Sequence, residues 1–359
     1  MKEAIVSKGT KVEIVDSPIP EPNDDQVLIK VVVSGSNPKD WKLAEMRPVS
    51  MNQGDDIAGI VEKVGANVYE FKPGDRVAAF HQMFTPHGSY AEYAIAWAHT
   101  TFPIPPETSF EDAATLPLAA MTAAVGLYQV LNLPQPWDPI PGAGPPPAAY
   151  PPPPVAPVLP EAHHDIPLVI YGASSAVGFF TLQLARRSHI HPIICVAGRA
   201  IAHVEPLLDR ARGDAVVDYR AGDDSVVAGI EAALGGRELL HAFDAVSESG
   251  SPQNLGRVLS TGGKAKVAFV LGGKKEVPGW VQQQTTHVGS VHSHAKDFGF
   301  VYYRYFARGL KEGWFRAQNV EVRPGGLGGV QGALEDLKAG RASAVKYVFR
   351  IAETEGVES

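Results

Sequence analysis

The sequence predicts an α/β protein in which a small β-rich domain is followed by a doubly wound, parallel sheet. Up to about residue 100, short apolar runs are separated by glycines and turn residues, which is typical of a twisted β-domain with tight corners. From residue 166 onward, apolar runs alternate with amphipathic stretches, which indicates strands alternating with helices. The chain has 359 residues and is 45% hydrophobic, enough for about two domains of ordinary size.

The β-rich half contains two clear strand signals. Val27 to Val33 is expected to be a strand, and the turn Pro73-Gly74-Asp75 leads into a second strand from Arg76 to Phe80. Between 109 and 130 the chain is rich in alanine and its apolar residues have helical spacing. Because Pro117 must begin or break a helix, we expect two helices there.

The second half begins with an apolar run, Ile166 to Tyr171, that suits a buried parallel strand. The later elements are expected as strands at 191–197, 215–219, 241–246 and 264–271, and as helices at 203–210, 225–234 and near 253–259. After residue 296, we expect an aromatic helix within 300–314, a helix at 331–339 and a closing strand at 345–351, packed back on the first domain.

The stretch IYGASSAVG, residues 170–178, joins the first of these strands to a helix-like pattern. The first N–H groups of a helix have no intrahelical partner and attract a pyrophosphate where small residues leave the approach open. We therefore expect Ser174, Ser175, Ala176 and Val177 to hold a pyrophosphate. Two serines stand where the usual glycine fingerprint has glycines, so an ordinary tight turn is the alternative.

The end of the strand at 191–197 indicates which dinucleotide is bound. An acidic residue there would accept from the 2′-hydroxyl of NAD, but this chain has Gly198 and Arg199. An arginine fork neutralises a 2′-phosphate, so NADPH is the expected cofactor, and a solvated surface arginine is the alternative.

Composition excludes several classes of protein. The net charge of −7 argues against a nucleic-acid binder, and the lone Cys195 excludes intrachain disulfides and any multi-cysteine metal site. The start MKEAIVSKGTKVEIV lacks the apolar core of a secretory signal, and no apolar run is long enough to span a bilayer. A soluble, cytoplasmic protein without nucleic-acid or membrane partners is expected.

Four further motifs, DDQVLIKVVVSGSNPKDWK, GDDIAGIVEKVGANVYEFKPGDRV, HGSYAEY and LPLAAMTAAVGLY, resemble successive signatures of the medium-chain dehydrogenase/reductase superfamily. NPKDWK, YGASSAVG and VDYR together are most similar to fungal trans-acting enoyl reductases, near the zinc-free quinone oxidoreductases. The resemblance implies a GroES-like catalytic domain formed by residues 1–126 and 297–359, and a Rossmann NADPH-binding domain at 127–296.

Zinc-dependent members of the superfamily carry a cysteine, a Gly-His-Glu and another cysteine around the catalytic metal. Here Asn37 takes the first position, and Asp55 and Asp56 follow Gly54, so that zinc site cannot be built. His287, His292 and His294 lie in a segment expected to be strand and turn, without carboxylate or cysteine support, so no metal is expected. Without a Lewis acid, reduction of a polarised C=C bond is favoured over alcohol oxidation.

The resemblance also implies site residues. Lys42 and Thr122 are the expected catalytic residues, Lys42 binding the nicotinamide ribose or polarising the site, with Lys39 as the nearby alternative. A solvated lysine and a packing threonine are the competing interpretations. The remaining cofactor contacts are expected from Lys39, Asp40, Trp41, Lys42, Gly198, Arg199, Tyr219, Leu271, Gly272, Gly273, Val345 and Lys346.

The expected reaction is NADPH-dependent reduction of an enoyl or enone group, on a small or carrier-bound unsaturated carbonyl substrate, in polyketide or other secondary metabolism. Quinone reduction and a non-catalytic NADPH-binding subunit of a larger synthase are the alternatives. Residues 134–160 are rich in proline and are expected to be a solvated loop, although such segments also serve as docking ligands. A synthase partner is therefore possible, and the segment VGSVH, 288–292, leaves open whether the chain is a monomer or pairs through a sheet edge.

Overall fold

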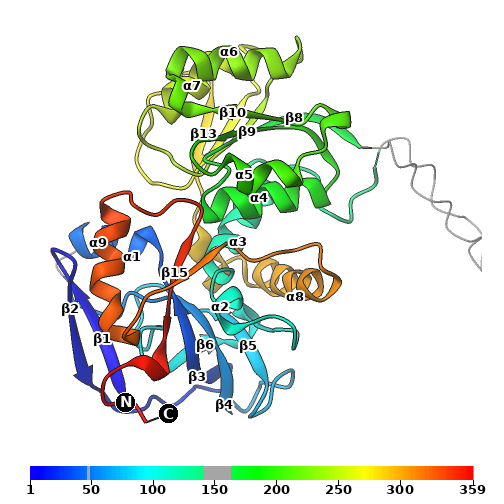
Figure 1. Ribbon diagram of the computed structural model, residues 1–359. Helices are drawn as coiled ribbons and strands as arrows, with labels where there is room; N and C mark the ends of the chain where they lie inside the picture. Colours follow the sequence, from blue (N-terminus) through cyan, green and yellow to red (C-terminus); the bar gives the residue numbers. More distant parts are fainter. Residues whose placement is uncertain (47–48, 141–162, 359) are drawn as a thin grey trace, which may run out of the picture. The chain divides into compact units, whose positions relative to one another are not determined.

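The structure is a computed structural model that describes residues 1–46, 49–140 and 163–358. The chain divides into two compact units. Figure 1 shows the chain with colours that follow the residue number. Unit 1 comprises Met1–Met121 and His287–Ser359, and unit 2 comprises Thr122–Thr286. Most of the proline-rich segment expected as a loop, residues 141–160, lies outside the described residues.

Unit 1 is built on a mainly antiparallel sheet, in which β14 and β15 alone pair in parallel among the described strands, with a hairpin of β1 (Lys2–Ser7) and β2 (Lys11–Asp16) beside it. The strands of the main sheet run in the order β14-β15-β3-β4-β5-β7, and β6 also pairs with β3. Their bounds are β3 (Gln26–Gly35), β4 (Asp56–Val64), β5 (Arg76–Phe80), β6 (Tyr93–Trp97), β7 (Thr101–Pro103), β14 (Val320–Val322) and β15 (Lys346–Arg350). The expected strands at 27–33 and 76–80 are therefore confirmed.

The helices of unit 1 come from both ends of the chain. They are α1 (Pro38–Met46), α2 (Phe110–Ala113), α3 (Pro117–Ala124), α8 (Lys296–Glu312) and α9 (Val330–Lys338), and α3 continues into unit 2. α1 and α9 lie side by side in Figure 1, and Lys338 of α9 donates to Glu45 of α1. The unit's core brings Ile29 and Val77 of the sheet together with Leu334 of α9.

Unit 2 contains a wholly parallel sheet in the order β10-β9-β8-β11-β12-β13. The bounds are β8 (His164–Tyr171), β9 (Ile190–Ala197), β10 (Ala215–Asp218), β11 (His241–Asp244), β12 (Lys266–Phe269) and β13 (Gln282–Thr285). Counted in chain order, this is the strand order of a dinucleotide-binding Rossmann fold, which confirms the doubly wound sheet. The longer helices of this unit are α4 (Ala176–Arg187), α6 (Asp223–Leu234) and α7 (Ser251–Val258).

Local sequence explains where these helices begin and end. Ser175 is the N-cap of α4, since its hydroxyl accepts from the Gly178 N–H at 3.1 Å. Gly235 ends α6 with a φ of 57°, the left-handed conformation that glycine adopts without steric cost. Pro117 begins α3, so the two helices expected between 109 and 130 are present, and a π-helical segment, Val125–Val130, follows. Among the described helices, none is both long and apolar enough to cross a bilayer.

Two expectations were wrong. The helix expected at 203–210 is replaced by α5 (Ile201–Val204) and a 3-10 turn, Glu205–Leu207, because Pro206 has no N–H to continue the helical ladder and Leu208 is extended. VGSVH is a 3-10 helix, Val288–His292, rather than a strand or a sheet edge, because the Ser290 N–H bonds the His287 carbonyl. One edge strand of the parallel sheet in unit 2 is β13, whose residues are polar.

Candidate active site

The turn between β8 and α4 has the geometry of a phosphate-binding turn. Gly172 has a φ of 76°, and a Cβ there would lie 2.5 Å from Val246, so a side chain is excluded on both counts. A Cβ at Gly178 would lie 2.2 Å from the Gly172 carbonyl oxygen, so the helix approaches the turn more closely than an alanine would permit. Ser174 and Ser175 follow this turn, and Ala176 and Val177 begin α4, at the end of a helix where the first N–H groups have no intrahelical partner. These residues fit a pyrophosphate.

Gly198, Arg199 and Tyr219 are brought together at the carboxyl end of β9 and β10. A Cβ at Gly198 would lie 2.4 Å from the Tyr219 ring, so the ring lies against the glycine backbone. Tyr219 is 46% exposed, and the Arg199 side chain is exposed as well. β9 neighbours β8, so these three residues lie at the same sheet edge as the phosphate-binding turn. The arrangement fits an adenosine ribose that carries a 2′-phosphate.

Leu271 and Gly272 follow β12 at this same edge of the sheet. The backbone N–H groups of Val270 and Leu271 both point to the Ser247 hydroxyl, at 2.8 and 3.3 Å. Ser247 lies in the loop after β11, and Asp244 holds that loop by accepting from its N–H at 2.7 Å. The sequence did not single out Ser247, which connects the loop after β11 to the loop expected to face the nicotinamide.

In unit 1, the expected residues Lys39 to Lys42 all lie on α1. Asp40 is fully buried and accepts from the Asn37 N–H at 2.7 Å and the Tyr90 hydroxyl at 2.6 Å. The Lys42 ammonium lies 5.5 Å from the centre of the Trp41 ring. The Asp40 carboxylate is therefore enclosed by donors of the protein itself.

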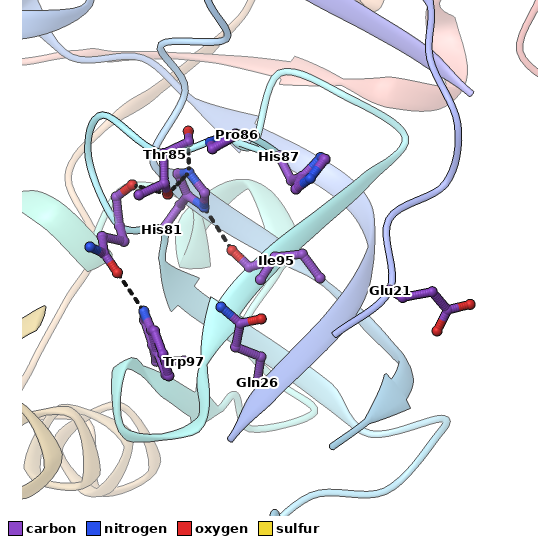
Figure 2. A pocket seen from close by; sticks show the side chains of 9 residues that line it. Glu21, Gln26, His81, Thr85, Pro86, His87, Ile95 and Trp97 are labelled. Carbon is purple, nitrogen blue, oxygen red and sulfur yellow. Dashed lines mark hydrogen bonds between the residues drawn. The ribbon is translucent and has the colours of Figure 1, made fainter. Parts of the chain in front are cut away.

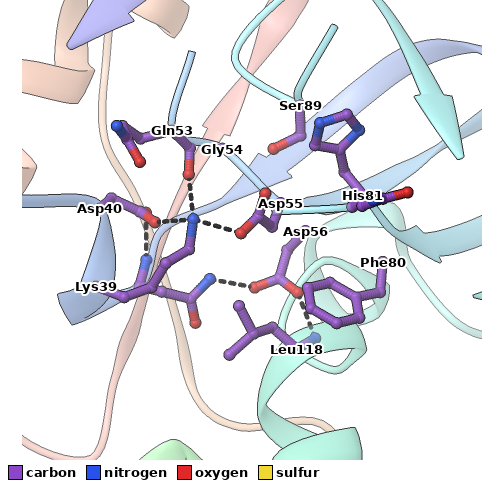
Figure 3. A network of polar contacts seen from close by, with 12 residues as sticks. Lys39, Asp40, Gln53, Gly54, Asp55, Asp56, Phe80, His81, Ser89 and Leu118 are labelled. Carbon is purple, nitrogen blue, oxygen red and sulfur yellow. Dashed lines mark hydrogen bonds and ion pairs between the residues drawn. The ribbon is translucent and has the colours of Figure 1, made fainter. Parts of the chain in front are cut away.

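Figure 3 shows the Lys39 ammonium directed at two carboxylates and a carbonyl. It lies 3.0 Å from Asp40, forms an ion pair with Asp55 and donates to the Gln53 carbonyl at 2.6 Å. The Lys39 side chain is 19% exposed, whereas those of Asp40 and Asp55 are 0% and 3% exposed. This ammonium therefore connects α1 to the segment before β4.

A second ion pair lies between Lys346 of β15 and Asp56 of β4, with 2.5 Å between Nζ and Oδ2. Lys346 also donates to Asn37 Oδ1 at 2.9 Å, and the Asn37 amide donates to Asp56 at 2.7 Å. The other Asp56 oxygen accepts from the Leu118 N–H at the start of α3, at 2.6 Å. We call Lys39, Asp40, Asp55, Asp56 and Lys346 the buried charge cluster.

Three groups of this cluster, Asp40, Asp55 and Lys39, have raised pKa values. Burial raises the pKa of Asp55 to about 7, although Lys39 opposes the effect, and Asp40 adds to it. Burial likewise raises the pKa of Asp40, against the influence of Lys39 and Tyr90. For Lys39, burial works to lower the pKa, but the Asp40 and Asp55 carboxylates outweigh it and hold the pKa above its ordinary value. Lys39 is therefore a permanent cation.

The other two expected site residues are placed as follows. Thr122 is buried on α3 and is the first residue of unit 2. Val345 is partly buried against the unit 1 core, immediately before β15. Apart from Thr122 on α3, the expected residues thus form two groups, one at the carboxyl ends of the strands of unit 2 and one on α1 and at the start of β15 in unit 1.

Asn37, Asp55 and Asp56 stand at the positions where zinc-dependent members of the superfamily are expected to carry metal ligands. Asn37 accepts a hydrogen bond from Lys346, and the two aspartates form ion pairs with Lys39 and Lys346. Among the described residues, no three His, Cys, Asp or Glu side chains are grouped to hold a metal ion. His292 belongs to a 3-10 helix and not to the expected strand, and burial lowers the pKa of its imidazole to about 3. Its Nε2 lies 3.2 Å from the Phe80 carbonyl oxygen.

Unit 1 also contains the pocket shown in Figure 2, with a volume of about 240 Å³. His81 lies at its wall with Nδ1 2.7 Å from the Ile95 carbonyl, and burial lowers the pKa of its imidazole to about 4, so the ring is neutral at neutral pH. The Trp97 indole donates to Gln82 at 2.7 Å. These polar groups have partners within the protein, and the lining residues supply no cluster of cations for a phosphate.

Comparison with known proteins identifies the family. Residues 23–106 match the model of the alcohol dehydrogenase GroES-like domain. The trans-enoyl reductase fsr4 of Gibberella fujikuroi is 46% identical over 328 residues, which cover 90% of this chain and 91% of that protein. The chain belongs to the trans-enoyl reductase family.

A second member of the trans-enoyl reductase family, resD of Aspergillus sclerotiorum, is 32% identical over 97% of this chain and its own full length. The fold extends further: a solved mycobacterial structure in complex with NADPH superposes with a TM-score of 0.70 at 21% identity, covering 97% of this chain and 99% of the other. The resemblance to the medium-chain dehydrogenase/reductase superfamily is thus confirmed, as is the combination of a GroES-like and a Rossmann-type domain.

Proposed function

We propose that this chain reduces the C=C bond of an α,β-unsaturated carbonyl with NADPH, delivering a hydride to the β-carbon and a proton to the α-carbon. Family membership is the observation that carries this proposal, since relatives of nearly the same length at 46% and 32% identity are trans-enoyl reductases. The phosphate-binding turn between β8 and α4 supports a dinucleotide. NADPH supplies the hydride, and the chain's residues must bind, orient and shield the reactants.

The preference for NADPH rests on the end of β9. Gly198 and the exposed Arg199 stand where an NAD enzyme places an acidic residue. A guanidinium pairs with a 2′-phosphate through two parallel hydrogen bonds, whereas an acid would repel it. We propose that Arg199 binds the 2′-phosphate, that Tyr219 lies by the adenine, and that Ser174 to Val177 hold the pyrophosphate.

We further propose that Lys42 and Thr122 act at the reacting end, and that Leu271 and Gly272 face the nicotinamide. An ammonium at Lys42 would bind the nicotinamide ribose or stabilise the negative charge that develops on the substrate oxygen. Loss of such a donor costs about 100-fold in kcat, so Lys42→Met should reduce turnover by that order. Lys30→Met, which changes an exposed lysine of β3, is the matched control.

The substrate is proposed to be carrier-bound. The relatives are named trans-enoyl reductases. We interpret "trans" as action on an acyl chain held by a separate protein, and this interpretation supports a synthase as the partner. A carrier-bound thioester should then be reduced more efficiently than the same acyl group on a small thiol.

The direct test is stopped-flow oxidation of NADPH with a panel of enoyl thioesters, enones and quinones. Reduction of enoyl thioesters with a saturated product supports the proposal. Turnover of quinones alone would assign the site to quinone reduction. Tight NADPH binding by calorimetry without turnover of any acceptor would indicate a non-catalytic subunit.

A further inference from the structure

The buried charge cluster contains three carboxylates and two ammonium groups. The side chains of Asp40, Asp55 and Asp56 are 0%, 3% and 0% exposed. Lys346 forms an ion pair with Asp56, and Lys39 forms ion pairs with both Asp40 and Asp55. Placing charges in such a site is costly unless each is paired and hydrogen-bonded, so the cluster is maintained by these specific contacts.

Lys39 differs from Lys346 because it connects a helix to a loop. Its ammonium belongs to the first turn of α1, while Gln53 and Asp55 belong to the extended segment that enters β4. Figure 3 shows the ammonium between these two segments. The contact is therefore a link between the start of α1 and the segment 53–55.

The position of α1 matters because Lys42 lies on it, one turn beyond Lys39. Residues three apart on a helix share a face, so a movement of the first turn displaces Lys42 as well. Asp40 adds further polar contacts to this first turn, since its carboxylate accepts from the Asn37 N–H and from the Tyr90 hydroxyl. Those contacts depend on the Asp40 carboxylate, which is itself paired with Lys39.

We propose that Lys39 is a positioning residue for the reductase reaction: its ammonium fixes α1 to segment 53–55 and so sets the location of Lys42. This proposal rests on the proposed function. Lys39 acts through Lys42 and the backbone of α1, since its ammonium contacts are to oxygens of the protein itself.

The test requires two variants, because Lys39→Met leaves two carboxylates without their cation and can prevent folding. In the double variant Lys39→Met/Asp55→Asn, one positive and one negative charge are removed together. Its thermal midpoint should recover toward that of the wild type, while the link to the Gln53 carbonyl remains absent. Lys30→Met is the matched control for loss of a lysine.

Hydrogen–deuterium exchange of the peptide spanning α1 is the first measurement, since it reports the helix whether or not the chain is active. In the double variant we expect exchange in α1 to be about tenfold faster, as for loss of a charge-assisted hydrogen bond, with exchange in β3 unchanged. NADPH affinity by fluorescence titration and kcat with an enoyl thioester should each fall by about tenfold.

Three results would overturn the proposal. In the first, the double variant folds and its α1 exchange, NADPH affinity and kcat remain within about twofold of wild type, so that Lys39 merely balances charge. In the second, NADPH affinity and kcat fall in the folded double variant while exchange in α1 stays at the wild-type rate, so that Lys39 does not act through α1. In the third, Lys30→Met produces the same losses. A wild type that binds NADPH but reduces no acceptor would refute the proposed reaction, while exchange and affinity still decide the role of Lys39.

Discussion

Removing the Lys346 ammonium should strongly destabilise unit 1. Lys346→Met leaves the Asp56 carboxylate, whose side chain is 0% exposed, with its hydrogen bonds from Asn37 and Leu118 but without a cation. Breaking one side of a buried pair typically costs about 3–5 kcal/mol. At about 2–4 °C per kcal/mol for a unit of this size, the midpoint of thermal unfolding should fall by about 6–20 °C.

Scanning calorimetry at pH 7.5 measures this change, and two further variants make it specific. Lys338→Met breaks the surface pair with Glu45, whose side chains are 43% and 26% exposed, and should cost about 0–1 kcal/mol. Lys346→Met/Asp56→Asn removes both charges and should recover much of the loss. The reasoning is refuted if Lys346→Met lowers the midpoint no more than Lys338→Met, or if the double variant is no more stable than the single.

Three other outcomes are expected. Arg199→Ala should lower kcat/KM for NADPH by about 10–100-fold and leave the value for NADH unchanged; an unchanged preference would show that Arg199 does not bind the 2′-phosphate. Gly178→Ala places a Cβ 2.2 Å from the Gly172 carbonyl oxygen and should weaken NADPH binding by calorimetry, whereas Gly262→Ala, with open space around it, should not. Asp55 has its pKa raised by burial from 3.8 to about 7, so the folded protein retains a proton that the unfolded chain releases, and stability from this group falls as the pH rises from about 4 to about 7. Asp55→Asn should flatten this part of the stability profile, measured by urea unfolding, and an unchanged slope would contradict the assignment.

Much of the fold follows from local patterns. The strand at 76–80 and the alternation after residue 166 were predictable because period and turn residues act over a few neighbours. The predictions failed where two local conformations were both compatible with the hydrophobic pattern. Apolar residues at 203–210 suggested one helix, yet the α-helix ends at Val204 and a 3-10 turn that contains Pro206 follows it. Residues 288–292 have a strand-like composition but form a 3-10 helix.

The grouping of site residues at the carboxyl ends of the parallel strands in unit 2 was also predictable in outline. Parallel strands place their carboxyl ends together, so Gly198, Arg199 and the turn at 172–178 had to lie at one edge once the sheet was inferred. The contact of the Tyr219 ring with Gly198 was not predictable, because it depends on side-chain packing between neighbouring strands. Ser247 gave no sequence signal either, since its role arises from two loops that meet after folding.

The sequence by itself determined the family and the fold class, including the tight turn that joins β8 to α4. Only the tertiary structure decided what Lys39 and Lys346 contact: both were expected at the cofactor, and each proves to be paired with aspartates of the segment 55–56. Lys346 and Asp56 are 290 positions apart and meet through β15, β3 and β4 of one sheet. Such a pairing follows from strand order and register across the whole unit, which no local pattern specifies.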